Sequence, residues 1–222
     1  VARVGHIVES PARVALWRSE TGTRTVGPQI VFPKVAFVSV TSTNLDFSWM
    51  SFLDRPPLTA DTRVFVASIS GNWWSEQELP LESGDHDQPV LIVDPFGNPN
   101  VAFTWQDTSL GGPTVEVRWA TSDASGWNEQ YIASTTKIDY SEVGRGIAAA
   151  KTAGGRRYVA YRDGNALTVA ESPGAYSSWT FETFTTSEAY RPEHLDLAID
   201  SSGDPHVAWS SNWGSNDNGV HY

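Results

Sequence analysis

The sequence predicts an all-β fold, and three observations support this prediction. The 222 residues include 18 glycines and 13 prolines, so turns must be frequent. Charged residues make up only 18% of the chain, while aromatic residues reach 12%, a composition unlike that of helical bundles and coiled coils. Short apolar segments also recur between turn motifs with a period of about fifty residues, which is typical of repeat architectures.

The repeat is clearest around the turn motif Asp-x-x-Gly-x-Pro, which occurs at residues 94–99 and 200–205. Each copy lies between two apolar segments, as expected for a turn that joins two strands. Asp can accept hydrogen bonds within the turn, Gly can take a positive φ, and Pro begins the next strand without an amide donor. A degenerate copy lies at residues 154–157, and a fainter turn at residues 41–44 follows the apolar segment 35–38.

Each repeat continues with a third strand and then a fourth strand that opens on tryptophan, at Trp74, Trp127 and Trp179. Four short antiparallel strands per repeat are typical of a β-propeller blade. The first strand of each unit is almost wholly apolar, as expected for an inner strand that is buried on both faces. These tryptophans are therefore expected to pack between blades.

The chain is expected to form a single domain over residues 1–222, a small β-propeller of about four blades of four antiparallel strands. Three expected blades cover approximately residues 31–84, 85–138 and 139–188. The last blade would combine residues 189–222 with residues 1–30, so that both chain termini close the ring and leave no open sheet edge. The alternative is that the chain is a piece of a larger propeller.

Composition and charge exclude several function classes. The chain has 15 Lys and Arg against 26 Asp and Glu, a net charge of −11, and no basic block that would suit nucleic acid. No apolar stretch is long enough to predict a membrane span. The absence of cysteine excludes disulfides and thiol catalysis. The chain begins at Val1, as a processed product or a fragment would, and its acidic, Trp-rich composition suggests a secreted, extracellular bacterial protein.

The repeat unit resembles the Asp-box (BNR-type) repeats of sialidase-like bacterial β-propellers, over residues 31–222. The most specific piece is residues 121–127, which are similar to the Ser/Thr-x-Asp-x-Gly-x-x-Trp hairpin of that family but shorter. Residues 70–73 and 172–179 keep the Trp and lose the Asp. In the family this hairpin is structural and lies far from the active site. The resemblance implies sialidases, other glycosidases, polysaccharide lyases or non-catalytic glycan-binding propellers.

The resemblance also implies where a ligand would bind. Propeller sites usually lie among the loops that lead into each inner strand and those that join the second and third strands. These loops contribute the candidate ligand-binding residues, which are His86, Asp107, Tyr140, Arg145, Arg162, Tyr190, Arg191, His194 and Trp213. Arginine binds a carboxylate with two hydrogen bonds, histidine transfers protons near neutral pH, and tryptophan stacks on the apolar face of a sugar.

The sequence assigns no catalytic residue and predicts no cofactor. A calcium site formed by Asp85, Asp87 and Asp94 is disfavoured because these residues lie at different ends of one predicted strand. No H-x-H or H-E-x-x-H pattern that would bind zinc is present. No metal site is therefore predicted.

The leading hypothesis is a secreted, lectin-like carbohydrate-binding propeller, because surplus tryptophan and acidic side chains are the groups that hold sugars. The alternative is a polysaccharide-processing enzyme on the same face, either a lyase or a sialidase-like glycoside hydrolase. In that case Arg145, Arg162 and Arg191 could hold a substrate carboxylate, and His86 or His194 could act as a base. A protein-interaction scaffold is the third hypothesis. The expected partner is a glycan or polysaccharide, and association with further copies of the chain is left open.

Overall fold

The computed structural model describes residues 3–8, 13–18, 23–29, 39–44, 47–54, 61–70, 73–94, 96–107, 114–136, 146–164, 166–185, 192–211 and 219–222. The regular elements in these residues are all β-strands, which confirms the predicted all-β class. Within this part of the chain there is no long apolar helix of the kind that crosses a membrane.

The strands in the described residues form five antiparallel sheets. The first sheet contains β1 (Arg3–Val8), β2 (Arg13–Arg18) and β3 (Thr23–Gln29). The second contains β4 (Ser39–Asn44), β5 (Phe47–Asp54), β6 (Arg63–Ser70) and β7 (Trp73–Glu78). The third contains β8 (Asp85–Val93), β9 (Pro99–Gln106), β10 (Thr114–Asp123) and β11 (Gly126–Thr136). The fourth contains β12 (Ile147–Lys151), β13 (Arg157–Asp163), β14 (Ala166–Ser172) and β15 (Thr180–Thr185), and the fifth contains β16 (Pro192–Ile199), β17 (Pro205–Ser211) and β18 (Gly219–His221).

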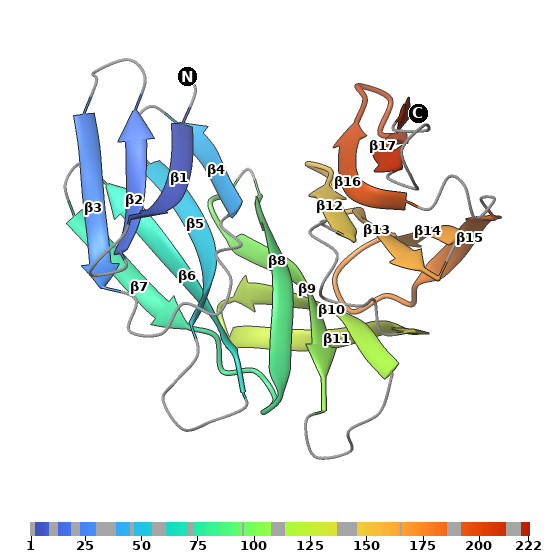
Figure 1. Ribbon diagram of the computed structural model, residues 1–222, viewed down its shortest axis with the longest axis horizontal. Helices are drawn as coiled ribbons and strands as arrows, with labels where there is room; N and C mark the ends of the chain where they lie inside the picture. The colour runs from blue at the N-terminus through green and yellow to red at the C-terminus, as the bar shows by residue number, and fades with distance from the viewer. Residues whose placement is uncertain are drawn as a thin grey trace.

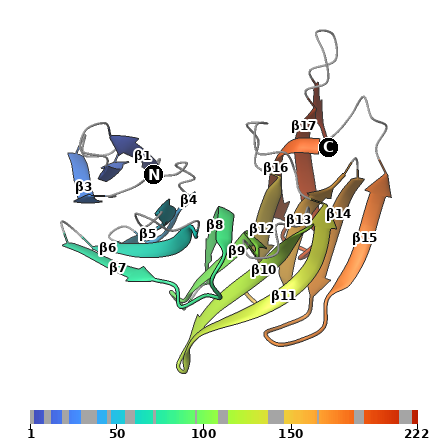
Figure 2. The ribbon, with the colours of Figure 1, turned by 60° about the horizontal axis from the view of Figure 1, so that its bottom comes forward.

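The sheets are arranged as the blades of a propeller. Within each sheet the strands lie in chain order, as Figure 2 shows for β12 to β15. The first strands of successive sheets contact one another, β1 with β4, β4 with β8, β8 with β12 and β12 with β16. The first strands are therefore the inner strands, and the sheets follow one another along an arc with the first and last sheets at its ends (Figure 1).

The expected blades and the observed sheets agree in part. The predicted units 31–84, 85–138 and 139–188 each contain one four-stranded sheet. In the remaining unit, β1 to β3 pair with one another, and β16 to β18 form a separate sheet. The expected count of about four blades, with the last one shared by both chain ends, is therefore not confirmed. Local hairpins close short loops, which costs less chain entropy than pairing the two ends of the chain.

The second sheet also begins later than the sequence suggested. Residues 41–44, expected as a turn, belong to β4 and pair with β5. Their β-branched side chains Thr41 and Thr43 suit a strand. The apolar segment 35–38 lies outside the described residues.

The apolar core lies between neighbouring sheets. Leu53 and Val64 of the second sheet pack with Phe103 of the third, and all three are almost completely buried. A second cluster joins the third and fourth sheets, and a third joins the fourth and fifth. Trp127 packs against the first of these clusters and Trp179 against the second, which confirms the predicted packing between blades for these two tryptophans. The side chain of Trp74 lies outside the described part of the structure.

Each inner strand has two ends of different character. We call the end where it turns into the second strand the turn end, which comprises residues 94–98, 152–156 and 200–204. We call the opposite end, where the inner strand begins, the loop end. At the turn end, Asp94 Oδ1 accepts hydrogen bonds from the amides of Phe96 and Asn98, as the turn motif predicted. Asp200 Oδ1 accepts the equivalent bonds.

Candidate functional site

A β-bulge interrupts β8 close to its loop end. Asp87 is paired with Thr104 on β9, but the next paired residue is Val90, opposite Ala102. Gln88, within the bulge, has a φ of 51°, a left-handed conformation that is uncommon for a residue other than glycine. Bulges and strained backbone conformations cluster next to functional sites, where they redirect side chains.

The bulge is held by a small set of buried hydrogen bonds. The amide of Gln88 donates to Asp87 Oδ1 at 2.9 Å, and Thr104 Oγ1 donates to the Asp87 carbonyl at 3.2 Å. Gln88 Oε1 accepts from the amide of Gly146 at 2.6 Å, which links the third sheet to the start of β12. The side chains of Asp87, Gln88 and Thr104 are all buried. The bulge thus fixes a polar segment beside the inner strand of the next sheet.

Arg162 lies at the same loop end, at the junction of the fourth and fifth sheets. Its side chain is buried, Nε donates to the Gly164 carbonyl at 2.9 Å, and Nη1 donates to the Pro192 carbonyl at 3.5 Å. Its amide donates to the Gly146 carbonyl at 3.0 Å. In these contacts Arg162 fixes three segments of the loop end relative to one another, whereas the sequence proposed it as a ligand-binding residue.

A small cavity lies between the bulge and the fourth sheet. Gln88, Gly146, Tyr161 and Arg162 are among the residues that line it, and it has a volume of about 10 Å³. This volume suits a single water molecule and excludes a sugar ring. Burial raises the pKa of Tyr161 to about 12, so its hydroxyl stays protonated at neutral pH. The cavity therefore lies in the packed base of the loop end, lined by both polar and apolar side chains.

His86 precedes the bulge and lies between the second and third sheets. Its ring is buried, and Nδ1 lies 2.5 Å from the carbonyl oxygen of Thr62, which requires the proton to be on Nδ1. Burial lowers the pKa of His86 below its ordinary value of 6.5. His86 is therefore a neutral, inward-facing histidine rather than one exposed to a loop-end ligand.

The other predicted site residues are less fully placed. Asp107 is half-buried just after β9, and His194 is exposed on β16. The remaining five lie outside the described residues, and these are Tyr140, Arg145, Tyr190, Arg191 and Trp213.

The sequence did not single out Gln88, Gly146 or Thr135 at the loop end. Thr135 Oγ1 donates to Asp163 Oδ1 at 2.8 Å and so connects β11 to the end of β13. Pro89 was the available signal for the bulge, because proline within a sheet is confined to edges, strand starts and bulges. Among the described residues, no group of three His, Asp or Glu side chains could hold a metal ion.

Comparison with solved structures supports the fold. A thermostable family-43 glycoside hydrolase aligns with a TM-score of 0.56 at 11% identity, covering 97% of this chain and 85% of that one. An endo-arabinase from Bacteroides thetaiotaomicron aligns with a TM-score of 0.54 at 13% identity, covering 98% and 92%. The polysaccharide lyase Uly1 aligns with a TM-score of 0.52 at 12% identity, covering 98% of this chain and 54% of the lyase. No protein-family model matches the sequence, and no curated protein sequence matches it significantly.

These similarities define the chain as a β-propeller-type protein. Their identities of 11 to 13% establish a shared fold only. None of the three is described as a sialidase, so the Asp-box resemblance stays a prediction.

Proposed function

We propose that this chain is a polysaccharide-processing enzyme that cleaves glycosidic bonds at the loop end of the propeller. The observation that carries the proposal is the strained bulge at Asp87 and Gln88, which holds a buried carboxylate at the start of an inner strand. The shared fold with two glycoside hydrolases and a polysaccharide lyase supports this choice over a purely lectin-like role. An extracellular setting, where polysaccharides are accessible, remains part of the proposal.

Glycoside hydrolysis usually needs two carboxyl groups on either side of the bond that breaks. Asp87 is the first candidate, because Gln88 and Thr104 fix its backbone and carboxylate in one position. Asp107 and Asp163 are the candidates for the second carboxyl group, since Asp107 directly follows β9 and Asp163 is the last residue of β13, and both strands end at the loop end. One carboxyl group would protonate the leaving oxygen, and the other would activate water or attack the sugar directly.

Arg162 and Gln88 act as positioning residues in this scheme. Arg162 binds the Gly164 and Pro192 carbonyls, and Gln88 binds the Gly146 amide. Together they fix the segments from which β12 and β16 begin. Displacement of a reacting group by about 1 Å can cost about a hundredfold in rate, so rigid support of this kind matters for catalysis.

The proposal is tested by incubating the chain with neutral and acidic polysaccharides and measuring new reducing ends. Asp87→Asn is expected to lower the rate at least about a hundredfold, because it removes a proton-transfer group or nucleophile. The matched control is Asp123→Asn, the same substitution at an exposed position of the β10–β11 hairpin, which is expected to leave the rate unchanged. Circular dichroism and thermal unfolding would establish that both variants fold.

Each other outcome supports a different function. Glycan binding without any cleavage would overturn the enzyme proposal in favour of a lectin-like protein. Products that carry an unsaturated uronate, detected by ultraviolet absorbance, would replace hydrolysis by lyase chemistry. If neither binding nor cleavage is found with any glycan, the protein-interaction hypothesis gains support.

A further inference from the structure

A pocket of about 670 Å³ lies at the turn end, opposite to the loop end. It is formed between the β12–β13 turn of the fourth sheet and the β16–β17 turn of the fifth. Thr152 and Arg156 line it from one side, and Ile199, Asp200 and Ser202 line it from the other. The volume is within the range of about 300 to 1,000 Å³ that is usual for small-molecule sites.

The three turns at this end have the same backbone geometry. Residues 94, 152 and 200 each donate their amide to the carbonyl four residues later. Gly97, Gly155 and Gly203 occupy equivalent positions with φ values of 87°, 88° and 91°. The turns can therefore be compared residue by residue.

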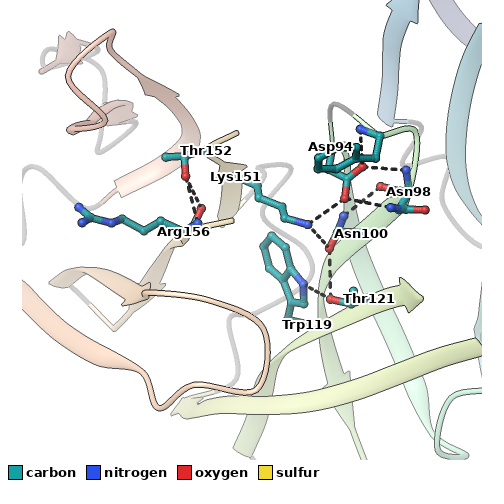
Figure 3. A network of polar contacts seen from close by, with 9 residues as sticks. Asp94, Asn98, Asn100, Trp119, Thr121, Lys151, Thr152 and Arg156 are labelled. Atoms are coloured by element: carbon teal, nitrogen blue, oxygen red, sulfur yellow. Dashed lines mark hydrogen bonds and ion pairs between the residues drawn. The ribbon is translucent and has the colours of Figure 1, made fainter. Parts of the chain in front are cut away.

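At the boundary between the third and fourth sheets, an ion pair joins the first residue of one turn, Asp94, to the residue just before the next turn, Lys151. Lys151 Nζ, just before the β12–β13 turn, lies 3.2 Å from Asp94 Oδ2 and 3.3 Å from Asn100 Oδ1 (Figure 3). Both partners of the ion pair are largely buried. The lysine side chain thus spans the space between the two turns.

At the boundary between the fourth and fifth sheets, uncharged residues occupy the same two positions. Thr152 replaces the aspartate, and its Oγ1 accepts a hydrogen bond from the Arg156 amide within its own turn (Figure 3). Ile199 replaces the lysine. Neither residue can form an ion pair across the boundary, and the pocket lies there.

Among the charged groups that line the pocket, Asp200 is an anion and Arg156 is the partner available to an anionic ligand. Lys151 is neutralised by Asp94, and Asp200 accepts hydrogen bonds from its own turn and lies 3.2 Å from His206 Nε2. The Arg156 guanidinium, whose side chain is 49% exposed, lies 3.4 Å from Glu171 and donates to the Tyr158 hydroxyl. A guanidinium has five N–H donors in a planar fork, so Arg156 retains donors for a carboxylate.

We propose that this pocket binds a short acidic oligosaccharide, with its carboxylate on Arg156. The hydroxyls of Ser201 and Ser202 would bind sugar hydroxyls, while Ile199 and Pro173 supply apolar surface for the ring carbons. The site lies at the opposite end of the inner strands from the proposed catalytic site. It would hold an acidic polysaccharide on the protein without cleaving it.

Isothermal titration with trigalacturonate tests the proposal. We expect saturable binding that Arg156→Ala weakens at least about tenfold, because one charged hydrogen-bonding partner is worth about 1.5 kcal/mol or more. Arg63→Ala is the matched control, since Arg63 also forms an exposed ion pair, with Glu78. Arg63 belongs to the second sheet, whereas the pocket lies between the fourth and fifth sheets. Equal binding of a neutral trisaccharide, binding of acetate as tight as that of trigalacturonate, or an unchanged affinity in Arg156→Ala would each overturn the proposal.

A second variant tests the structural origin of the pocket. Thr152→Asp combined with Ile199→Lys restores the pair found at the preceding boundary, and we expect it to fill the pocket and abolish trigalacturonate binding. Its melting temperature should not fall, which separates a filled pocket from a misfolded protein; full binding in a folded double variant would contradict the proposal. Asp87→Asn should keep trigalacturonate binding, so this site and the proposed catalytic function can fail independently.

Discussion

The guanidinium of Arg157, on β13, lies 4.7 Å from the centre of the ring of Trp179, which directly precedes β15 of the same sheet. The same guanidinium lies 5.5 Å from the centre of the Trp119 ring of the third sheet. Nη2 donates to Gln130 Oε1 at 3.0 Å and to the Gly174 carbonyl at 2.7 Å. Arg157 therefore joins two neighbouring blades through aromatic and hydrogen-bonding contacts at once.

Replacement of this arginine should strongly destabilise the protein. Burial lowers the pKa of Arg157 to about 10, because desolvation disfavours its charged form. Arg157→Ala is expected to lower the free energy of unfolding by about 3 kcal/mol, because it leaves a buried gap and unpaired acceptors between the blades. Urea unfolding followed by tryptophan fluorescence measures the change.

The adjacent arginine provides the control for this prediction. Arg156 is exposed, and its ion pair with Glu171 is more than a third exposed on both sides. Arg156→Ala should therefore cost less than about 1 kcal/mol of stability. Equal destabilisation by the two variants would show that Arg157 has no special role between the blades.

His86 makes stability depend on pH. Its buried ring is neutral in the folded protein, since burial lowers its pKa, whereas in the unfolded chain it takes up a proton below its ordinary value of 6.5. The unfolded state then binds more protons, so stability is full above about pH 6.5 and falls as the pH is lowered towards the folded pKa. The melting temperature should therefore drop as the pH is lowered below about 6.5.

Two variants identify the histidine responsible. His86→Gln should flatten this pH dependence because it removes the buried titrating group. His194→Gln, at an exposed histidine of β16, should retain it. If His86→Gln kept the full loss of stability on acidification, another group would have to be its source.

The sequence predicted those features that depend on local chemistry. The Asp94 and Asp200 turns follow from side chains that bind amides two and four residues away, so spacing alone reveals them. The Asp123 hairpin, where Oδ1 accepts from the Ser125 amide and Gly126 has a positive φ, belongs to the same class. By contrast, the pairing of residues 1–30 with one another or with the C-terminal strands depends on distant contacts that no local pattern encodes.

The candidate site was predictable only in outline. The order of the strands along the chain predicted that His86 and Arg162 lie at the loop end, but it did not predict the direction of their side chains. The structure directs Arg162 to the Gly164 carbonyl and His86 to Thr62, because the packing of adjacent sheets decides which backbone groups need partners. The sequence did not indicate Gln88, because its role depends on a backbone conformation that glutamine rarely adopts.

The contact between Gln88 and Gly146 should be measurable as stability. Gln88→Met keeps the length of the side chain but removes the oxygen that accepts the Gly146 amide at 2.6 Å. Leaving that buried amide without a partner should cost about 1 to 3 kcal/mol in thermal or urea unfolding. Gln77→Met, at an exposed position of β7, is the control and should change stability by less than about 0.5 kcal/mol.

The last prediction concerns the ion pair between Lys151 and Asp94. Burial alone would raise the pKa of Asp94, but hydrogen bonds from Asn98 and Lys151 outweigh it and hold the pKa below its ordinary value of 3.8. The lowered pKa means that this contribution to stability is present above about pH 4 and is lost as the pH falls towards the folded pKa. Acid should therefore weaken the pair.

A double-mutant cycle isolates this interaction. Asp94→Asn, Lys151→Met and the double variant should give a coupling free energy of about 1 to 2 kcal/mol at neutral pH, because the two partners are only 10% and 13% exposed. The Arg63–Glu78 pair is more than 40% exposed on both sides, so the same cycle there should give less than about 1 kcal/mol. If the first coupling were as small as the second, burial of the pair would not strengthen the contact between the third and fourth sheets, and the lysine would serve only to fill the space between their turns.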